Sequence, residues 1–126
     1  MSDLTPSIQV LVVEPNQALT TPYQFFPKEY KLDRAKTIKQ ATDLLANNTY
    51  QLFSISSSFS AENQLILLNS FKHQFKKQVI PLLVVINLSQ PISSVVGTNW
   101  SNKIAFLANN ASSKLTLSTL ELLLSA

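Results

Sequence analysis

Five serines lie close together near the middle of the chain, at Ser54, Ser56, Ser57, Ser58 and Ser60. A serine becomes a catalytic nucleophile when a histidine and an acidic residue activate it, and His73 and Glu14 are the residues to consider for those roles. His73 is expected more than three turns along the helix that leaves the serines, some ~20 Å away at about 1.5 Å per residue. That distance excludes a Ser-His-acid triad.

A structural role accounts for the serines better than a phosphorylatable loop does, because serine hydroxyls bond nearby backbone groups in turns and helix caps. His73 has no cysteine or acidic residue at ligand spacing, so no metal site is predicted. Gly97 is the only glycine, which leaves no glycine-rich phosphate loop. The residues therefore predict no catalytic group and no cofactor.

Buried strands are expected to position these serines. Tyr50–Ser56 is typical of a central strand that runs into a polar loop and then a helix. Ile8–Val13 and Val79–Ile86 are near-continuous apolar runs, the pattern of strands covered on both faces. Lys31–Ala35 predicts a short edge strand with charge on its outer face, and Lys103–Ala108 predicts a fifth strand.

Helices are predicted between the strands. A short, distorted helix is expected from Thr21 to Phe26, because Pro22 suits a first helical turn. Thr37 should cap a second helix, which has an apolar face formed by Ile38, Ala41, Leu44 and Leu45.

Three more helices complete the pattern. Ser60 should cap the third, with Leu65, Leu68 and Phe71 setting its periodicity and Ile66 and Leu67 widening its buried stripe. A weak helix is expected from Pro91 to Gly97. The last should begin after Ser112 or Ser113, with a shared apolar face formed by Leu117, Leu120 and Leu124.

The bulk properties fit one domain. The chain has 126 residues, of which 45% are hydrophobic, and we expect a polar lead-in over residues 1–7 and a domain over residues 8–126. It has no cysteine, and no apolar run reaches the ~18 residues of a membrane span, so a cytoplasmic location without membrane contact is expected. The net charge of +3 comes from basic groups within residues 28–39 and 72–77, which we interpret as solvated faces.

Strands and helices that alternate five times predict an α/β domain with a parallel sheet and right-handed crossovers. Over residues 8–126 this organisation resembles the receiver domain of bacterial two-component response regulators. Pro81 stands where that family commonly opens its fourth strand, and Phe106 stands where it keeps a switching aromatic residue. The resemblance implies a flavodoxin-like five-stranded parallel sheet of order 2-1-3-4-5, with helices on both faces and Tyr50–Ser56 at its centre.

The resemblance also locates the family's phosphotransfer positions, and this chain departs from the pattern there. The family has an acidic pair after strand one, a phosphoacceptor aspartate ending strand three, a hydroxyl residue ending strand four and a lysine after strand five. The matching residues here are Glu14 and Pro15, Ser56, Ile86 and Asn109. One carboxylate remains where the family presents three to magnesium, and a serine cannot form an acyl phosphate. The resemblance thus implies a pseudo-receiver of a phosphorelay signalling system, in which the receiver fold is kept as a binding or regulatory module without phosphotransfer.

A receiver without phosphotransfer is expected to act by protein–protein interaction in a signal-transduction pathway rather than as an enzyme. By the same resemblance its partner surface covers the last two strand–helix units, and pairing of two copies stays open. The apolar candidates for that contact are Ile92, Val95, Val96 and Trp100. Two alternatives also remain open: a small-ligand sensor that uses the emptied pocket near Glu14, Ser56 and Asn109, and weak nucleic-acid binding through the basic residues of 28–39.

Overall fold

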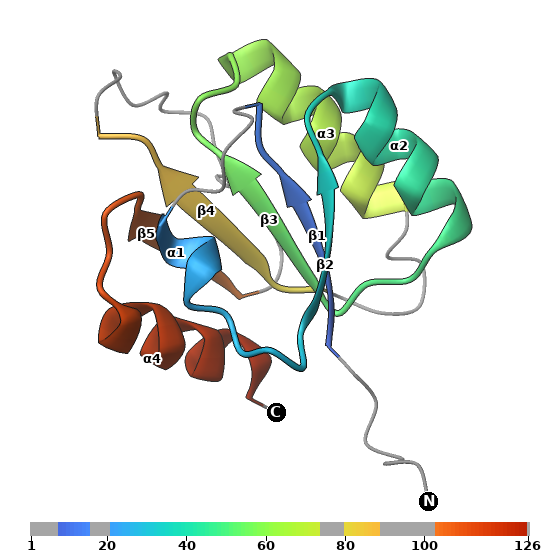
Figure 1. Ribbon diagram of the computed structural model, residues 1–126. Helices are drawn as coiled ribbons and strands as arrows, with labels where there is room; N and C mark the ends of the chain where they lie inside the picture. The colour runs from blue at the N-terminus through green and yellow to red at the C-terminus, as the bar shows by residue number, and fades with distance from the viewer. Residues whose placement is uncertain (1–7, 16–20, 74–79, 89–102, 126) are drawn as a thin grey trace, which may run out of the picture.

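The computed structural model describes residues 8–15, 21–73, 80–88 and 103–125 (Figure 1). Within them five strands form one sheet in the order β2-β1-β3-β4-β5, and every neighbouring pair is parallel. The strands are β1 (Gln9–Val13), β2 (Lys31–Ala35), β3 (Leu52–Ser56), β4 (Leu82–Ile86) and β5 (Ile104–Ala108). The predicted fold class, strand order and central strand are confirmed, and each strand other than β2 is shorter at its start than expected.

Helices cover both faces of this sheet. In the described ranges they are α1 (Thr21–Gln24), α2 (Ile38–Asn47), α3 (Ala61–His73) and α4 (Ser113–Leu124). Figure 1 shows α2 and α3 on one face and α1 and α4 on the other. None of these helices combines the length and the apolar character needed to span a bilayer. The helix predicted for Pro91–Gly97 lies outside the described residues.

The central strand β3 is buried along its whole length because it has a neighbour on each side and a helical layer on each face. Phe53 and Ile55 point into the core beneath α2 and α3, and Leu52 points into the core beneath α1 and α4. Phe53 stacks on Phe71 of α3, with ring centroids 4.1 Å apart. The alternation of the strand therefore joins the sheet to both layers.

The buried stripe of α3 differs from the predicted one. Leu67, Leu68 and Phe71 are buried as expected, but Leu65 and Ile66 are exposed, and the polar side chain that takes their place is Gln64. Gln64 is tolerated there because its Nε2 donates to the Phe59 carbonyl oxygen at 2.6 Å. Gln64 thus belongs to the buried stripe of α3 because its side-chain amide binds the loop before the helix. Hydrophobicity alone predicted Leu65 and Ile66 in that stripe.

The buried face of α4 was predicted only in part, since Leu120 is buried and Leu124 is partly buried as expected. Ser112 is the N-cap, and its side chain accepts a hydrogen bond from the Leu115 amide. The expected Leu117 is exposed, whereas the buried residues are Thr116, Thr119, Leu120 and Leu123. Leucines surround this helix on several sides, so periodicity could not select one face. Thr119 can be buried because its hydroxyl donates to the Leu115 carbonyl within the helix at 2.8 Å.

Truncation in the central strand tests this packing. Ile55→Ala should lower the free energy of unfolding by roughly 2–5 kcal/mol, because a fully buried side chain is lost and a cavity remains. A urea melt measures the change. Leu65→Ala is the matched control on the exposed side of α3, and it should cost well under about 1 kcal/mol. Equal losses in the two variants would contradict the assignment of β3 to the core.

Candidate functional site

The carboxyl ends of β1, β3, β4 and β5 bring the predicted site positions to one edge of the sheet. Glu14 directly follows β1, Ser56 ends β3, Ile86 ends β4 and Asn109 directly follows β5. In an open parallel sheet this edge is where ligands bind, at the point where the strand order reverses. Ser56 and Glu14 are nonetheless almost fully buried, with 2% and 1% of their surface exposed. A solvent-borne reactant has little access to either side chain.

A network of neutral side chains occupies this edge, and Asn87 is at its centre. The Asn87 amide nitrogen donates to Ser57 Oγ at 2.8 Å, and its side-chain Nδ2 donates to Ser58 Oγ at 3.0 Å. Asn109 Nδ2 reaches Asn87 Oδ1 at 3.4 Å. Asn87 therefore connects the loops that follow β3, β4 and β5 to one another.

Ser56, the position that matches the phosphoacceptor, belongs to the same polar layer. Its Oγ accepts a hydrogen bond from the Ser58 amide at 3.0 Å, which closes a local turn. Ser60 caps α3, as predicted, by accepting from the Asn63 amide at 3.2 Å. The turn-and-cap interpretation of the serines is therefore confirmed at both positions.

A second polar group lies under this edge, on the side of the sheet that carries α1. The Tyr23 hydroxyl and Ser54 Oγ are 2.7 Å apart and both are buried. Burial raises the pKa of the Tyr23 phenol, and the nearby Glu14 carboxylate raises it further, while the Ser54 hydrogen bond and Arg34 act in the opposite direction. Glu14 and Arg34 thus act in opposite directions on the buried Tyr23 hydroxyl.

The residues present do not fit the magnesium ion that a receiver fold implies. Magnesium prefers octahedral oxygen coordination with carboxylates supplying negative charge. Glu14 is the one carboxylate among the matching positions, Pro15 has no side-chain oxygen, and Ser56 Oγ is already hydrogen-bonded. Among the described residues no group of three or more His, Cys, Asp or Glu side chains could hold a metal ion.

Ile86 and Phe106 stand at the two positions that match the family's switch, and both side chains are apolar. Ile86 packs against the core beneath α2 and α3, so it contributes an apolar side chain and no hydroxyl at the end of β4. Phe106 is 53% exposed on β5. The predicted contact residues Ile92, Val95, Val96 and Trp100 lie outside the described residues.

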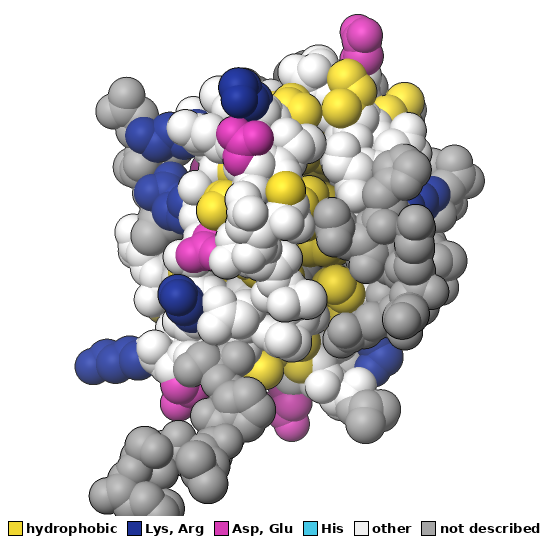
Figure 2. Space-filling model, turned by 90° about the vertical axis from the view of Figure 1, so that its right-hand side faces the viewer, with side chains coloured by type: hydrophobic (Ala, Val, Ile, Leu, Met, Phe, Trp, Pro, Cys, Tyr) yellow, Lys and Arg dark blue, Asp and Glu magenta, His cyan; other side chains and the backbone are white. Residues whose placement is uncertain are grey.

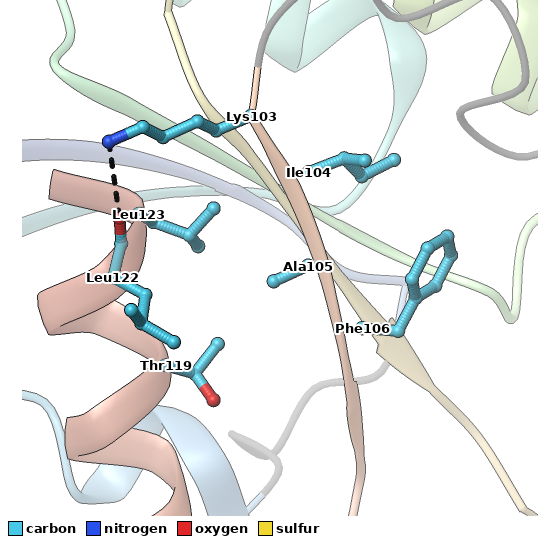
Figure 3. Close-up of a pocket in the computed structure, with 7 residues that line it drawn as sticks. All are labelled: Lys103, Ile104, Ala105, Phe106, Thr119, Leu122 and Leu123. Atoms are coloured by element: carbon cyan, nitrogen blue, oxygen red, sulfur yellow. Dashed lines mark hydrogen bonds between the residues drawn. The ribbon is translucent and has the colours of Figure 1, made fainter.

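A groove of about 290 Å³ lies where the edge strand β5 meets α4. Figure 3 shows Ala105 pointing toward α4, and Ile104 and Phe106 pointing away from it. Lys103 Nζ donates to the Leu122 carbonyl oxygen at 3.3 Å and to the Ser125 carbonyl oxygen at 2.5 Å, which satisfies carbonyl groups at the C-terminal end of α4. This groove is at the opposite flank of α4 from Leu117 and away from the Ser–Asn network.

The basic residues of 28–39 form no continuous positive surface. Figure 2 shows acidic side chains between the basic ones on the side of the molecule that carries β2 and α2. Lys39 forms an exposed ion pair with Asp43 at 3.3 Å. Asp33 accepts a hydrogen bond from the Tyr50 hydroxyl at 2.8 Å. The solvated-face interpretation agrees with this distribution.

Sequence reasoning missed Asn87 and the Tyr23–Ser54 pair. The available signal for Asn87 was an asparagine placed directly after a strongly apolar strand, at the edge where site residues gather. For the pair, the signal was Ser54 in the interior of a buried strand, because a buried hydroxyl needs a partner. Neither signal identifies the partner, which lies about thirty residues away in each case.

Comparison with solved structures identifies the fold. The chain is similar to a response regulator receiver domain protein (CheY-like) from Methanospirillum hungatei JF-1, with a TM-score of 0.71, 16% identity and 94% of each chain covered. It is equally similar to the signal receiver domain of an HD domain-containing protein from Pseudomonas fluorescens Pf-5, with a TM-score of 0.71, 20% identity and 94% of each chain covered.

The chemotaxis response regulator CheY4 of Vibrio cholerae gives a TM-score of 0.70 at 13% identity, over 93% of this chain and 98% of the other. No protein-family model matches the chain, and no curated protein matches it by sequence. The fold is therefore that of CheY-like receiver domains. Because the sequence identities are this low, the similarity establishes the fold and nothing more.

Removing the central asparagine should weaken the polar edge. Asn87→Ala deletes the side-chain bonds to Ser58 and Asn109, so we expect a loss of about 1–3 kcal/mol in the free energy of unfolding. Asn110→Ala is the matched control, because Asn110 is the exposed neighbour of Asn109. Both variants are compared in urea melts. A neutral Asn87→Ala would show that the side-chain bonds of Asn87 add nothing to stability.

The buried tyrosines predict a pH dependence. Burial raises the pKa of Tyr23, and burial together with the Asp33 carboxylate raises the pKa of Tyr50. Above pH about 10, the ordinary tyrosine pKa, the unfolded chain loses phenolic protons that the native protein keeps, so stability falls as pH rises. Tyr23→Phe should flatten the fall between pH about 9.5 and about 12, measured by chemical denaturation. An unchanged slope would contradict the role of Tyr23.

Proposed function

We propose that this chain is a receiver-fold domain that accepts no phosphate and acts in signal transduction by binding another protein. The observation that carries the proposal is the neutral, hydrogen-bonded edge at the end of β3. There Ser56 is buried and bonded to the Ser58 amide, and Asn87 joins the neighbouring loops. The signalling context is supported by the solved structures of the same fold, which are response regulator and signal receiver domains.

The chemistry of phosphotransfer has no support at this edge. Ser56 offers a hydroxyl in place of the carboxylate that would form an acyl phosphate. Ile86 cannot donate a hydrogen bond to a phosphoryl oxygen, and the neutral Asn109 cannot pair with one ionically. Each of these replacements removes a different group that phosphotransfer needs. We therefore propose that the domain is neither phosphorylated nor an enzyme.

Loss of the switch leaves a surface that is always available to a partner. A modification shifts a conformational equilibrium only through different interactions with its two states, and the groups that would supply that difference are replaced here. The described part of the proposed surface is β5 and α4. Its exposed apolar side chains are Phe106, Leu115, Leu117 and Leu122.

The two alternatives have less support. A small-ligand sensor would need free polar groups at the strand ends, whereas Ser56, Asn87 and Asn109 bond to other groups of the protein. Nucleic-acid binding would need a continuous basic patch, whereas exposed Glu29 lies among the basic residues of 28–39 in the sequence and Lys39 is paired with Asp43. Thermal stabilisation by a metabolite panel would favour the first, and steeply salt-dependent association would favour the second.

Incubation with acetyl phosphate and magnesium tests the proposal. Intact-mass measurement should show no added phosphoryl group, because no acyl-phosphate acceptor is present at the end of β3. A receiver domain that keeps its acidic pair and phosphoacceptor aspartate is the positive control, handled in the same buffer. A stoichiometric adduct on the wild-type chain, removed by Ser56→Ala, would overturn the proposal.

A further inference from the structure

Helix α4 keeps two large leucines in water after it has packed on the sheet. Leu115 is 53% exposed and Leu122 is 72% exposed. Single exposed leucines are ordinary on protein surfaces, but these two are seven residues apart, so they stand two turns apart on one stripe of the helix. The stripe borders the groove beside β5, because Thr119 and Leu122 also line that groove.

Charged side chains repeat the same spacing on the same helix. Lys114 and Glu121 are both exposed and are also seven residues apart, one position before each leucine. Ser118, a small exposed residue, lies between the two stripes and midway along them. The two leucines therefore lie on either side of the middle of α4, near Ser118. The lysine and the glutamate do the same on the neighbouring stripe.

This arrangement is complementary to itself when the helix is turned end for end. In an antiparallel pair of α4 helices that crosses at Ser118, Leu115 of one copy lies opposite Leu122 of the other. On the other flank of the same pair, Lys114 lies opposite Glu121. A two-fold axis repeats both contacts, which is the condition for a closed dimer interface.

We propose that the partner of the α4 face is a second copy of this chain, held by antiparallel packing of α4 on α4. The inference rests on the proposed function in one respect, that the β5–α4 surface is the one used for contact. It goes further by naming the occupant from charge complementarity.

The surroundings of α4 suit this contact. Lys103 holds the C-terminal end of the helix through the Leu122 and Ser125 carbonyl oxygens, so the stripe is presented on a tethered element (Figure 3). A leucine of the second copy that lies against Leu122 reaches the wall of the groove that Thr119 also lines. A single helix pair falls below the ~1,200–2,000 Å² of a standard interface, so the dimer is weak and depends on concentration.

Charge reversal gives a test that a change in folding cannot imitate. Sedimentation equilibrium from about 10 μM to about 1 mM should show wild-type dimerisation within that range. Lys114→Glu alone, or Glu121→Lys alone, places like charges opposite each other twice per dimer and should weaken association about five- to tenfold. The double variant restores opposite charges and should return within about twofold of the wild-type constant.

Leucine variants supply the second arm. Leu122→Ser should leave the protein monomeric over the whole range, and Leu65→Ser, at an exposed leucine of α3 outside this surface, should leave dimerisation unchanged. Thermal melts confirm that each variant is folded.

A wild-type chain that stays monomeric at about 1 mM overturns the inference, as does a dimer that survives Leu122→Ser or is not restored by the double reversal. If one of these results is found and no phosphoryl adduct forms, self-association is rejected and the proposed function is still supported. A phosphoryl adduct rejects the proposed function whatever the association state.

Discussion

Three serine hydroxyls of the central strand and its loop are buried, so their hydrogen-bond partners must come from the protein itself. Ser54 shares a hydrogen bond with the Tyr23 hydroxyl. Ser56 accepts one from the backbone amide of Ser58, and Ser57 accepts one from the backbone amide of Asn87. The first contact holds α1 on one face of the sheet, and the last ties the end of β4 to the end of β3. The positions of several elements thus follow from satisfying groups on one strand.

A neutral edge has a physical advantage over a charged one in this setting. Several carboxylates buried together repel one another and require a cation, because removing a charge from water is costly unless it is paired. Hydroxyl and amide groups satisfy one another without an ion and carry no net charge. Such groups join the ends of β3, β4 and β5 here, and Glu14 after β1 is the one carboxylate among the matching positions.

Hydrophobic pattern was enough to predict the strands of a parallel sheet, because β1 and β4 are apolar runs typical of doubly covered strands, whereas the strand order followed from the resemblance to receiver domains. The same pattern placed Glu14, Ser56, Ile86 and Asn109 at the strand ends, where the structure has them.

Pattern failed where polar side chains are buried or where apolar ones surround a helix. Gln64 is buried because it binds the Phe59 carbonyl oxygen. On α4, Thr116 and Thr119 lie on the buried face and Leu117 does not. Asn87 acquires its role from Ser57 and Ser58, which are distant in sequence. Such partners are set by tertiary contact, so no local window of sequence contains them.

The parallel register has a consequence for the order in which the molecule assembles. The ladder between β1 and β3 joins segments some 42 residues apart, as the Gln9–Gln51 contact shows, and the contact of Ser57 with Asn87 spans 30 residues. Chains dominated by such long closures fold slowly, because loop entropy is lost before the contacts form. Strands β2 and β5 each have one neighbour, so the two edges of the sheet gain fewer contacts from an early central sheet than β3 does. We therefore expect the amides of these edge strands to exchange with solvent sooner than those of β3.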